Sequence, residues 1–261
     1  MGKVEMFTLD IHPFSQSPRK IWVYLPDSYE NNTRKYDVLY MFDGHNLFFD
    51  DLATYGKCWG IKDYLDKTGL DLVVAGVDCN HRGNRRLAEY CPYPPEKTHL
   101  EDLPKIHACG QETARWFAEV LKPETEKRYH VRKDRKHVGI AGSSMGGLMS
   151  EYMIAAYNNL YSRAACVSPS TFFNYEHLKK LIRNTDFSSD TYIYIDQGSQ
   201  EAHGKRLFID SMEIMLKMNR LYSERGCHTY PHLTPGGHHS EADWEKIVPV
   251  FIPYLFPDLI K

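Results

Sequence analysis

Short apolar runs alternate with segments of helical periodicity along most of the chain. Two runs near the N-terminus, Met6–Ile11 and Lys20–Leu25, alternate apolar and polar residues as half-exposed strands do. The turn over Pro13–Pro18 between them favours antiparallel pairing. Further strands, most of them apolar enough for a sheet buried on both faces, are expected at Tyr36–Phe42, Leu72–Val77, His137–Ala141, Arg163–Val167, Thr191–Ile195 and Cys227–Leu233.

Helical patterns fill most of the gaps between these strands. We expect helices at Trp59–Lys67, Gln111–Tyr129 with a break at Pro123, Gly146–Tyr157, Leu207–Arg225 and Asp243–Leu255. Strands that alternate with helices predict an α/β fold, with a mostly parallel central sheet, helices on both faces and antiparallel N-terminal strands. No linker or repeat divides the sequence, so residues 1–261 are expected to form a single domain. Residues 80–109 are polar and aperiodic, which predicts a long surface excursion.

Composition and charge indicate which kinds of partner and which cellular compartment to expect. The formal net charge of −2 gives no basic surface for nucleic acid. The first residues lack the apolar core of a signal peptide, and no run approaches the roughly 20 apolar residues of a membrane helix. The six cysteines form no C-x-x-C pair. We therefore expect a cytoplasmic protein with reduced thiols that binds neither nucleic acid nor membrane; its oligomeric state does not follow from the sequence.

The pentapeptide Gly142–Gly146 reads Gly-Ser-Ser-Met-Gly and lies between an expected strand and an expected helix. A G-x-S-x-G sequence in this context predicts a sharp turn that exposes the central serine as a nucleophile. That residue is Ser144, whereas Ser143 lies one position too early. The amide of Met145, at the helix N-terminus, is placed to stabilise an oxyanion.

A serine nucleophile needs a base and an acid, which follow it in the order acid then histidine in strand–turn–helix hydrolases. The loop after the strand Thr191–Ile195 offers Asp196 and Glu201 as the acid. The glycine-containing loop after the last strand offers His238 and His239 as the base.

Together with the pentapeptide, three segments carry a family resemblance: Asp43–Phe48, Gly198–Glu201 and His239–Trp244. In these motifs the chain resembles the Putative esterase family of α/β-hydrolases, from about Lys20 to Leu255. This family includes feruloyl and acetylxylan esterases, enterobactin-type esterases and mycolyltransferases. The resemblance implies an α/β-hydrolase fold and the catalytic residues Ser144, Glu201 and His239. It also implies that the backbone N–H of His45 completes the oxyanion hole with Met145.

Several residues near these motifs are candidates for substrate contact, each with a plainer alternative. Asp43 either contacts a substrate hydroxyl or holds the turn beneath the oxyanion loop. Arg86 and Tyr90 belong to a segment that resembles one near the substrate in the family. Tyr90 and Trp59 either line an acyl pocket or pack in the core. Asp196, the alternative acid, otherwise binds loop amides.

No cofactor or metal is expected. A hard-cation site at Asp43, Asp50 and Asp51 is disfavoured because acidic loop residues are usually only solvated. A zinc cluster of His228, His232, His238 and His239 is disfavoured because no zinc-binding motif accompanies them.

These features predict a serine esterase that acts through an acyl-enzyme on short-chain acyl esters, such as acetylated carbohydrate. An acyltransferase to a sugar hydroxyl is the second hypothesis, because the same triad serves both reactions. A catalytically silent binding protein on a hydrolase fold is the third.

Overall fold

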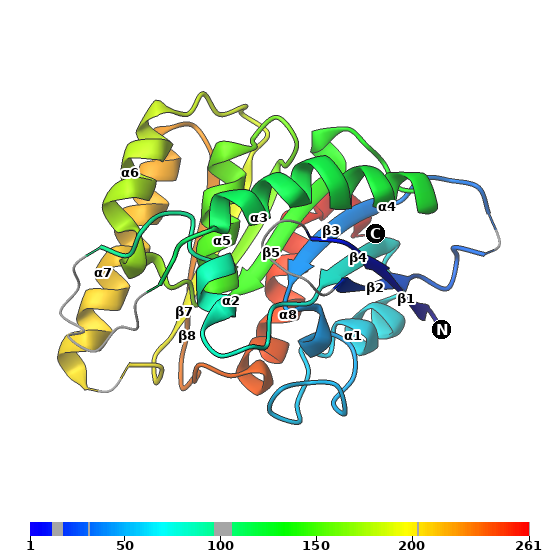
Figure 1. Cartoon of the computed structure of the whole chain (residues 1–261), viewed down its shortest axis with the longest axis horizontal. Coiled ribbons are helices and arrows are strands. Elements are labelled where there is room, and N and C mark those ends of the chain that lie inside the picture. Colours follow the sequence, from blue (N-terminus) through cyan, green and yellow to red (C-terminus); the bar gives the residue numbers. More distant parts are fainter. Residues whose placement is uncertain (12–17, 31, 97–105, 203, 261) are drawn as a thin grey trace.

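The computed structural model describes residues 1–11, 18–30, 32–96, 106–202 and 204–260. One β-sheet runs through the centre of the molecule (Figure 1). Its strand order in the described part of the chain is β1-β2-β4-β3-β5-β6-β7-β8. The strands are β1 Lys3–Leu9, β2 Arg19–Leu25, β3 Asp37–Phe42, β4 Leu72–Val77, β5 Val138–Ser143, β6 Arg163–Val167, β7 Tyr192–Gly198 and β8 His228–Thr234.

The N-terminal strands are antiparallel, as the sequence predicts. β1 pairs antiparallel with β2, and β2 pairs antiparallel with β4. All the other neighbouring pairs are parallel. Within the turn expected at Pro13–Pro18, positions 13–17 lie outside the described residues.

Helices cover both faces of the sheet (Figure 1). They are α1 Ile61–Thr68, α2 Arg85–Glu89, α3 Gly110–Trp116, α4 Lys122–Arg128, α5 Met145–Ala156, α6 Tyr175–Asn184, α7 Lys205–Glu224 and α8 Glu241–Leu255. Side chains of β3 alternate between two cores: Tyr40 packs with apolar residues of α3, α5, α6 and α7, whereas Met41 packs with those of α1 and α8. The period of two in a strand therefore builds a three-layer α/β molecule.

The break expected at Pro123 was wrong. The chain passes from α3 through a π-helical turn at Phe117–Leu121 directly into α4. The Lys122 N–H donates to the carbonyl of Phe117, which is the wider π spacing. Pro123 directly follows this π turn as the second residue of α4, so the helix continues past a residue that has no backbone N–H to donate.

Part of the segment 80–109 is helical, which its lack of periodicity did not predict. The five residues of α2 are too short to show a period, and tertiary contacts hold them. Glu89 of α2 forms a buried ion pair with Arg19 of β2, 2.7 Å apart. The helix α6 was also not predicted, and residues 97–105 lie outside the described residues.

Candidate active site

Ser144 lies on the tight turn between β5 and α5. Its backbone has φ 58° and ψ −121°, a conformation that is strained for a residue with a side chain. The turn closes only because a Cβ is absent at Gly142, where it would lie 2.7 Å from the carbonyl carbon of Gly146. Ser143 is the buried last residue of β5, so Ser144 is the serine that the turn presents.

Glu201 lies in the loop after β7 and accepts four hydrogen bonds. Its Oε1 accepts from the Gly198 N–H and the Ser168 hydroxyl, each at 2.6 Å. Its Oε2 accepts from Gln197 Nε2 at 2.8 Å and pairs with His239 Nδ1 at 2.9 Å. These bonds stabilise the charged carboxylate and fix its orientation toward His239.

Asp196, the alternative acid, is buried at the end of β7 and bonds to neighbouring loops instead. Its carboxylate accepts from the Ser168 N–H at 3.0 Å and from the Thr234 hydroxyl at 3.3 Å. Burial raises the pKa of Asp196 to about 7, and the nearby charge of Glu201 adds to the rise. The geometry thus gives Asp196 the amide-binding role and places Glu201 against the histidine.

His239 is the histidine that faces the acid. One edge of its ring packs against Trp244, with ring centroids 5.0 Å apart, and the Glu201 bond to Nδ1 leaves Nε2 free. His238 turns instead to the first turn of α8, where its Nδ1 lies 3.2 Å from Asp243 Oδ2.

The serine and the histidine are not hydrogen-bonded to each other in this structure. Among the described residues, Ser144 Oγ has Ser170 Oγ as its partner, 3.4 Å away. The side chain of His239 is 42% exposed, so packing does not enclose the ring on all sides. Catalytic hydrogen bonds are often long in ligand-free enzymes and tighten when substrate binds.

The loop after β3 lies beside the serine turn. Asp43 has φ 55°, and a short 3-10 helix, η1 (Gly44–Asn46), follows it. A Cβ on Gly44 would lie 2.3 Å from the carbonyl carbon of Gly76 in β4, so only glycine permits this close approach. The backbone of His45 belongs to η1, and that of Met145 begins α5.

The sequence matches the Putative esterase family over residues 14–253. The chain belongs to this family. Its relative YbbA, an uncharacterized protein of Bacillus subtilis (strain 168), is 24% identical over 190 residues, which are 72% of this chain and 71% of YbbA.

Solved structures of similar fold include two serine hydrolases. An IroE-like serine hydrolase from Shewanella oneidensis has a TM-score of 0.75 at 17% identity, covering 98% of this chain and 81% of that one. The S-formylglutathione hydrolase FrmB from Staphylococcus aureus has a TM-score of 0.65 at 17% identity and covers 97% of each chain. These likenesses confirm the predicted α/β-hydrolase fold.

In this esterase-family chain, Asp43 forms an ion pair with Arg86. The guanidinium donates through Nε and Nη2 to the two carboxylate oxygens, each at 2.7 Å, and lies 5.1 Å from the centroid of the Tyr90 ring. Burial lowers the pKa of Arg86, but the charge of Asp43 outweighs it and the net pKa is raised. The Tyr90 hydroxyl accepts from the Asp43 N–H at 3.4 Å. These contacts favour the turn-holding alternative for Asp43.

Trp59 and Tyr90, candidates for either an acyl pocket or the core, are both buried. Each is 2% exposed. The Trp59 ring packs against Trp244 at 5.5 Å between centroids, and Tyr90 packs against Phe42 at 4.9 Å. Since neither presents a free face, the packing alternative describes both.

The residues considered for metal sites do not converge. Asp43 pairs with Arg86, while Asp50 accepts from the Cys58 N–H at 2.8 Å. His228 stacks on Tyr192, whereas His239 pairs with Glu201. A different group does converge, and the sequence reading missed it: His45, Asp78, Cys79 and His81. The close spacing of Asp78, Cys79 and His81 was the available signal.

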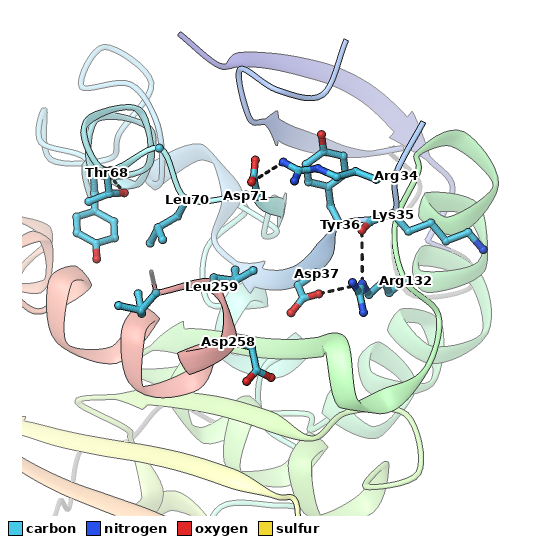
Figure 2. Close-up of a pocket in the computed structure, with 13 residues that line it drawn as sticks. Arg34, Lys35, Tyr36, Asp37, Thr68, Leu70, Asp71, Arg132, Asp258 and Leu259 are labelled. Carbon is cyan, nitrogen blue, oxygen red and sulfur yellow. Dashed lines mark hydrogen bonds and ion pairs between the residues drawn. The ribbon is translucent and has the colours of Figure 1, made fainter. Parts of the chain in front are cut away.

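A pocket of about 550 Å³ lies at the opposite end of the sheet from Ser144, at the start of β3 and β4 (Figure 2). Four of the charged side chains that line it form two pairs, Arg34 with Asp71 and Arg132 with Asp37 at 3.4 Å. It contains none of the predicted site residues. Separately, none of the helices in the described ranges has the length and apolar character required to span a bilayer.

Proposed function

We propose that this protein is a serine carboxylic-ester hydrolase in which Ser144, His239 and Glu201 form the catalytic triad. The observation that carries the proposal is the 2.9 Å contact between Glu201 and His239 Nδ1, in a chain whose Ser144 is held on a strained strand-to-helix turn. A base oriented by an acid and a nucleophile exposed by its backbone are the two requirements of acyl-enzyme chemistry. Family membership supports the same reaction class.

In the proposed reaction, Ser144 Oγ attacks the ester carbonyl and its proton passes to His239 Nε2. The N–H groups of His45 and Met145 hold the oxyanion. His239 then gives the proton to the leaving alcohol, and an acyl-enzyme remains. Water, deprotonated by His239, attacks the acyl carbon and releases the acid, while Glu201 stabilises the imidazolium in both steps.

The proposed substrates are small esters with short acyl groups, acetylated carbohydrate among them. Solved proteins of similar fold are described as a ferulic acid esterase, an S-formylglutathione hydrolase and an enterobactin and salmochelin hydrolase. This range shows that the fold serves several acyl and leaving groups, so the acyl group must be measured. A panel from acetyl to octanoyl and feruloyl esters, compared by kcat/KM, is expected to favour the short acyl chains.

The direct test is Ser144→Ala. We expect this substitution to reduce kcat on p-nitrophenyl acetate by several powers of ten and to abolish the acyl-enzyme mass adduct, because only oxyanion and binding contributions remain. Ser143→Ala is the matched control and should retain activity.

Three other outcomes would redirect the proposal. Undiminished turnover by Ser144→Ala contradicts it. Failure of a fluorophosphonate to label Ser144 in the folded protein favours the silent binding protein. An acylated sugar formed in preference to free acid favours the acyltransferase.

A further inference from the structure

Four side chains with metal-binding atoms gather where η1 meets the end of β4. His45, Asp78, Cys79 and His81 each offer one ligand atom, and these atoms all lie within 4.8 Å of one another. Asp78 directly follows β4, and His45 comes from η1. The rings of His45 and His81 lie edge to face, 4.6 Å between centroids. The proposed hydrolysis uses none of these side chains.

Hydrogen bonds around His45 indicate which of its ring nitrogens carries the proton. Asn46 Nδ2 donates to Glu241 Oε1 at 2.9 Å, so Asn46 Oδ1 faces Thr54. That oxygen accepts the Thr54 N–H at 2.9 Å and the Thr54 hydroxyl at 3.2 Å. A hydroxyl that has donated its proton is an acceptor for His45 Nε2–H, 2.9 Å away. His45 then carries its lone pair on Nδ1.

The carboxylate of Asp78 lies beside this nitrogen. His45 is only 8% exposed, and its Nδ1 lies 2.9 Å from Asp78 Oδ1. Nevertheless, the alignment is too poor for a hydrogen bond, and Nδ1 is a buried atom without a partner among the described residues. The same Asp78 oxygen lies 2.8 Å from His81 Nε2. A cation here would stabilise the His45 lone pair and the Asp78 carboxylate, and it would replace the His81 proton that now bonds to the same oxygen.

We propose that His45, Asp78, Cys79 and His81 bind one divalent transition-metal ion, with Zn²⁺ as the best fit. Two imidazoles, one carboxylate and one thiolate are the nitrogen, oxygen and sulfur donors that tetrahedral zinc accepts. Ligand atoms around tetrahedral zinc are about 3.3 to 3.8 Å apart. The widest spacings in the cluster, up to 4.8 Å, would therefore close by roughly 1 Å, and the two nitrogens near Asp78 Oδ1 would move slightly away from it. This proposal departs from the expectation, drawn from the sequence, that no metal is bound.

The surroundings meet the other requirements of a metal site. The side chain of His81 is 56% exposed, which gives the ion an entry path and lets this ring turn. Thr54 holds the second nitrogen of His45, as outer partners of metal-bound histidines do. Burial raises the pKa of the Cys79 thiol, so binding releases its proton to solvent as the sulfur–metal bond forms.

The bound ion would join η1 to the end of β4. The consequence for catalysis rests on the proposed function, because only the oxyanion role of the His45 amide makes the position of η1 matter. Metal binding itself depends on side chains and is measured independently of esterase activity.

The experiment is a titration of the chelator-treated full chain with Zn²⁺, followed by calorimetry. We expect one ion per chain and at least tenfold weaker binding in both Cys79→Ser and His81→Ala. Thr54→Val should weaken binding about 10- to 100-fold although every ligand remains. Co²⁺ in place of Zn²⁺ should give the absorption of a tetrahedral thiolate complex, which Cys79→Ser should lose.

Cys109→Ser and His228→Ala are the matched controls, since both lie outside the cluster, and should bind as the unsubstituted chain does. Absence of binding, or binding that both ligand substitutions leave unchanged, overturns the proposal. If Cys79→Ser does not fold, the Zn²⁺ titration of His81→Ala and the Co²⁺ spectrum of the unsubstituted chain still test the proposed site. Ser144→Ala should bind Zn²⁺ normally, so failure of the metal site and failure of the esterase proposal are distinguishable.

Discussion

At the scale of single residues, the site separates two acidic groups that the sequence places on one loop. Glu201 accepts bonds from both oxygens and holds His239 Nδ1, whereas Asp196 is buried against the Ser168 amide. Ser168 connects them, because its N–H donates to Asp196 and its hydroxyl to Glu201, and its own oxygen accepts from Trp244 Nε1 at 3.0 Å. The two carboxyls therefore have different tasks despite their proximity.

Glu201→Gln should lower kcat by about 10³- to 10⁴-fold, because an amide facing Nδ1 stabilises the wrong histidine tautomer. Asp196→Asn keeps an acceptor for the Ser168 N–H and should change kcat by less than about tenfold. Steady-state kinetics of both variants, with circular dichroism as a folding control, tests the assignment. A larger loss in Asp196→Asn than in Glu201→Gln would reverse it.

At the scale of elements, the loop after β3, which carries the proposed oxyanion N–H of His45, is positioned by a contact between two glycines. Gly44 of η1 touches Gly76 of β4, and the Asp43–Arg86 pair holds the same turn from the side of α2. A Cβ on Gly76 would lie 2.5 Å from Leu47 Cδ1 and 2.9 Å from Gly44 Cα. The distance between η1 and the sheet thus depends on the absence of one methyl group.

Gly76→Ala should push η1 away from the sheet, lower kcat by about 10- to 100-fold and destabilise the fold by about 1–3 kcal/mol. Gly69→Ala is the control for stability alone. Gly69 has φ 65°, and nothing lies within 4 Å of its would-be Cβ, so its cost of about 1–2 kcal/mol comes from the backbone. An unchanged kcat in Gly76→Ala, measured on the folded enzyme, would contradict the role of the contact.

At the scale of the whole molecule, two buried carboxyls couple folding to pH. Burial raises the pKa of Glu151 in α5 to about 8 and that of Asp196 to about 7. The folded protein therefore binds more protons than the unfolded chain between these values and the ordinary carboxyl pKa values near 4. The free energy of unfolding must fall as pH rises through this range.

Glu151→Gln should flatten this fall. Each unit of pKa difference corresponds to about 1.4 kcal/mol, so Glu151 is expected to cost on the order of 4 kcal/mol at pH 8.5 relative to pH 5. Urea denaturation at both pH values measures the difference, with the exposed Glu213→Gln as control. Equal pH dependence in Glu151→Gln and the unsubstituted chain would contradict the prediction.

The sheet and the serine turn could be predicted from the sequence because they rest on local patterns. Apolar runs, and glycines on either side of Ser144, carry their own signal. The short helix α2 and the continuous passage through Pro123 could not be predicted, because tertiary contacts hold the one and a π turn accommodates the other. The helix α6 was overlooked, although Leu178, Leu181 and Ile182 have helical spacing. The sequence also could not place Trp59 and Tyr90, because an apolar pattern is the same for a residue in a pocket wall and a residue in the core.

The sequence by itself determined the family, the strand–turn–helix at Ser144 and the order in which acid and histidine candidates follow it. Only the tertiary structure decided which acid meets His239, what engages Asp43, and that His45, Asp78, Cys79 and His81 converge. The reason is physical: backbone geometry and burial repeat over a few residues, whereas hydrogen bonds and metal ligands join side chains from distant loops at the ends of parallel strands.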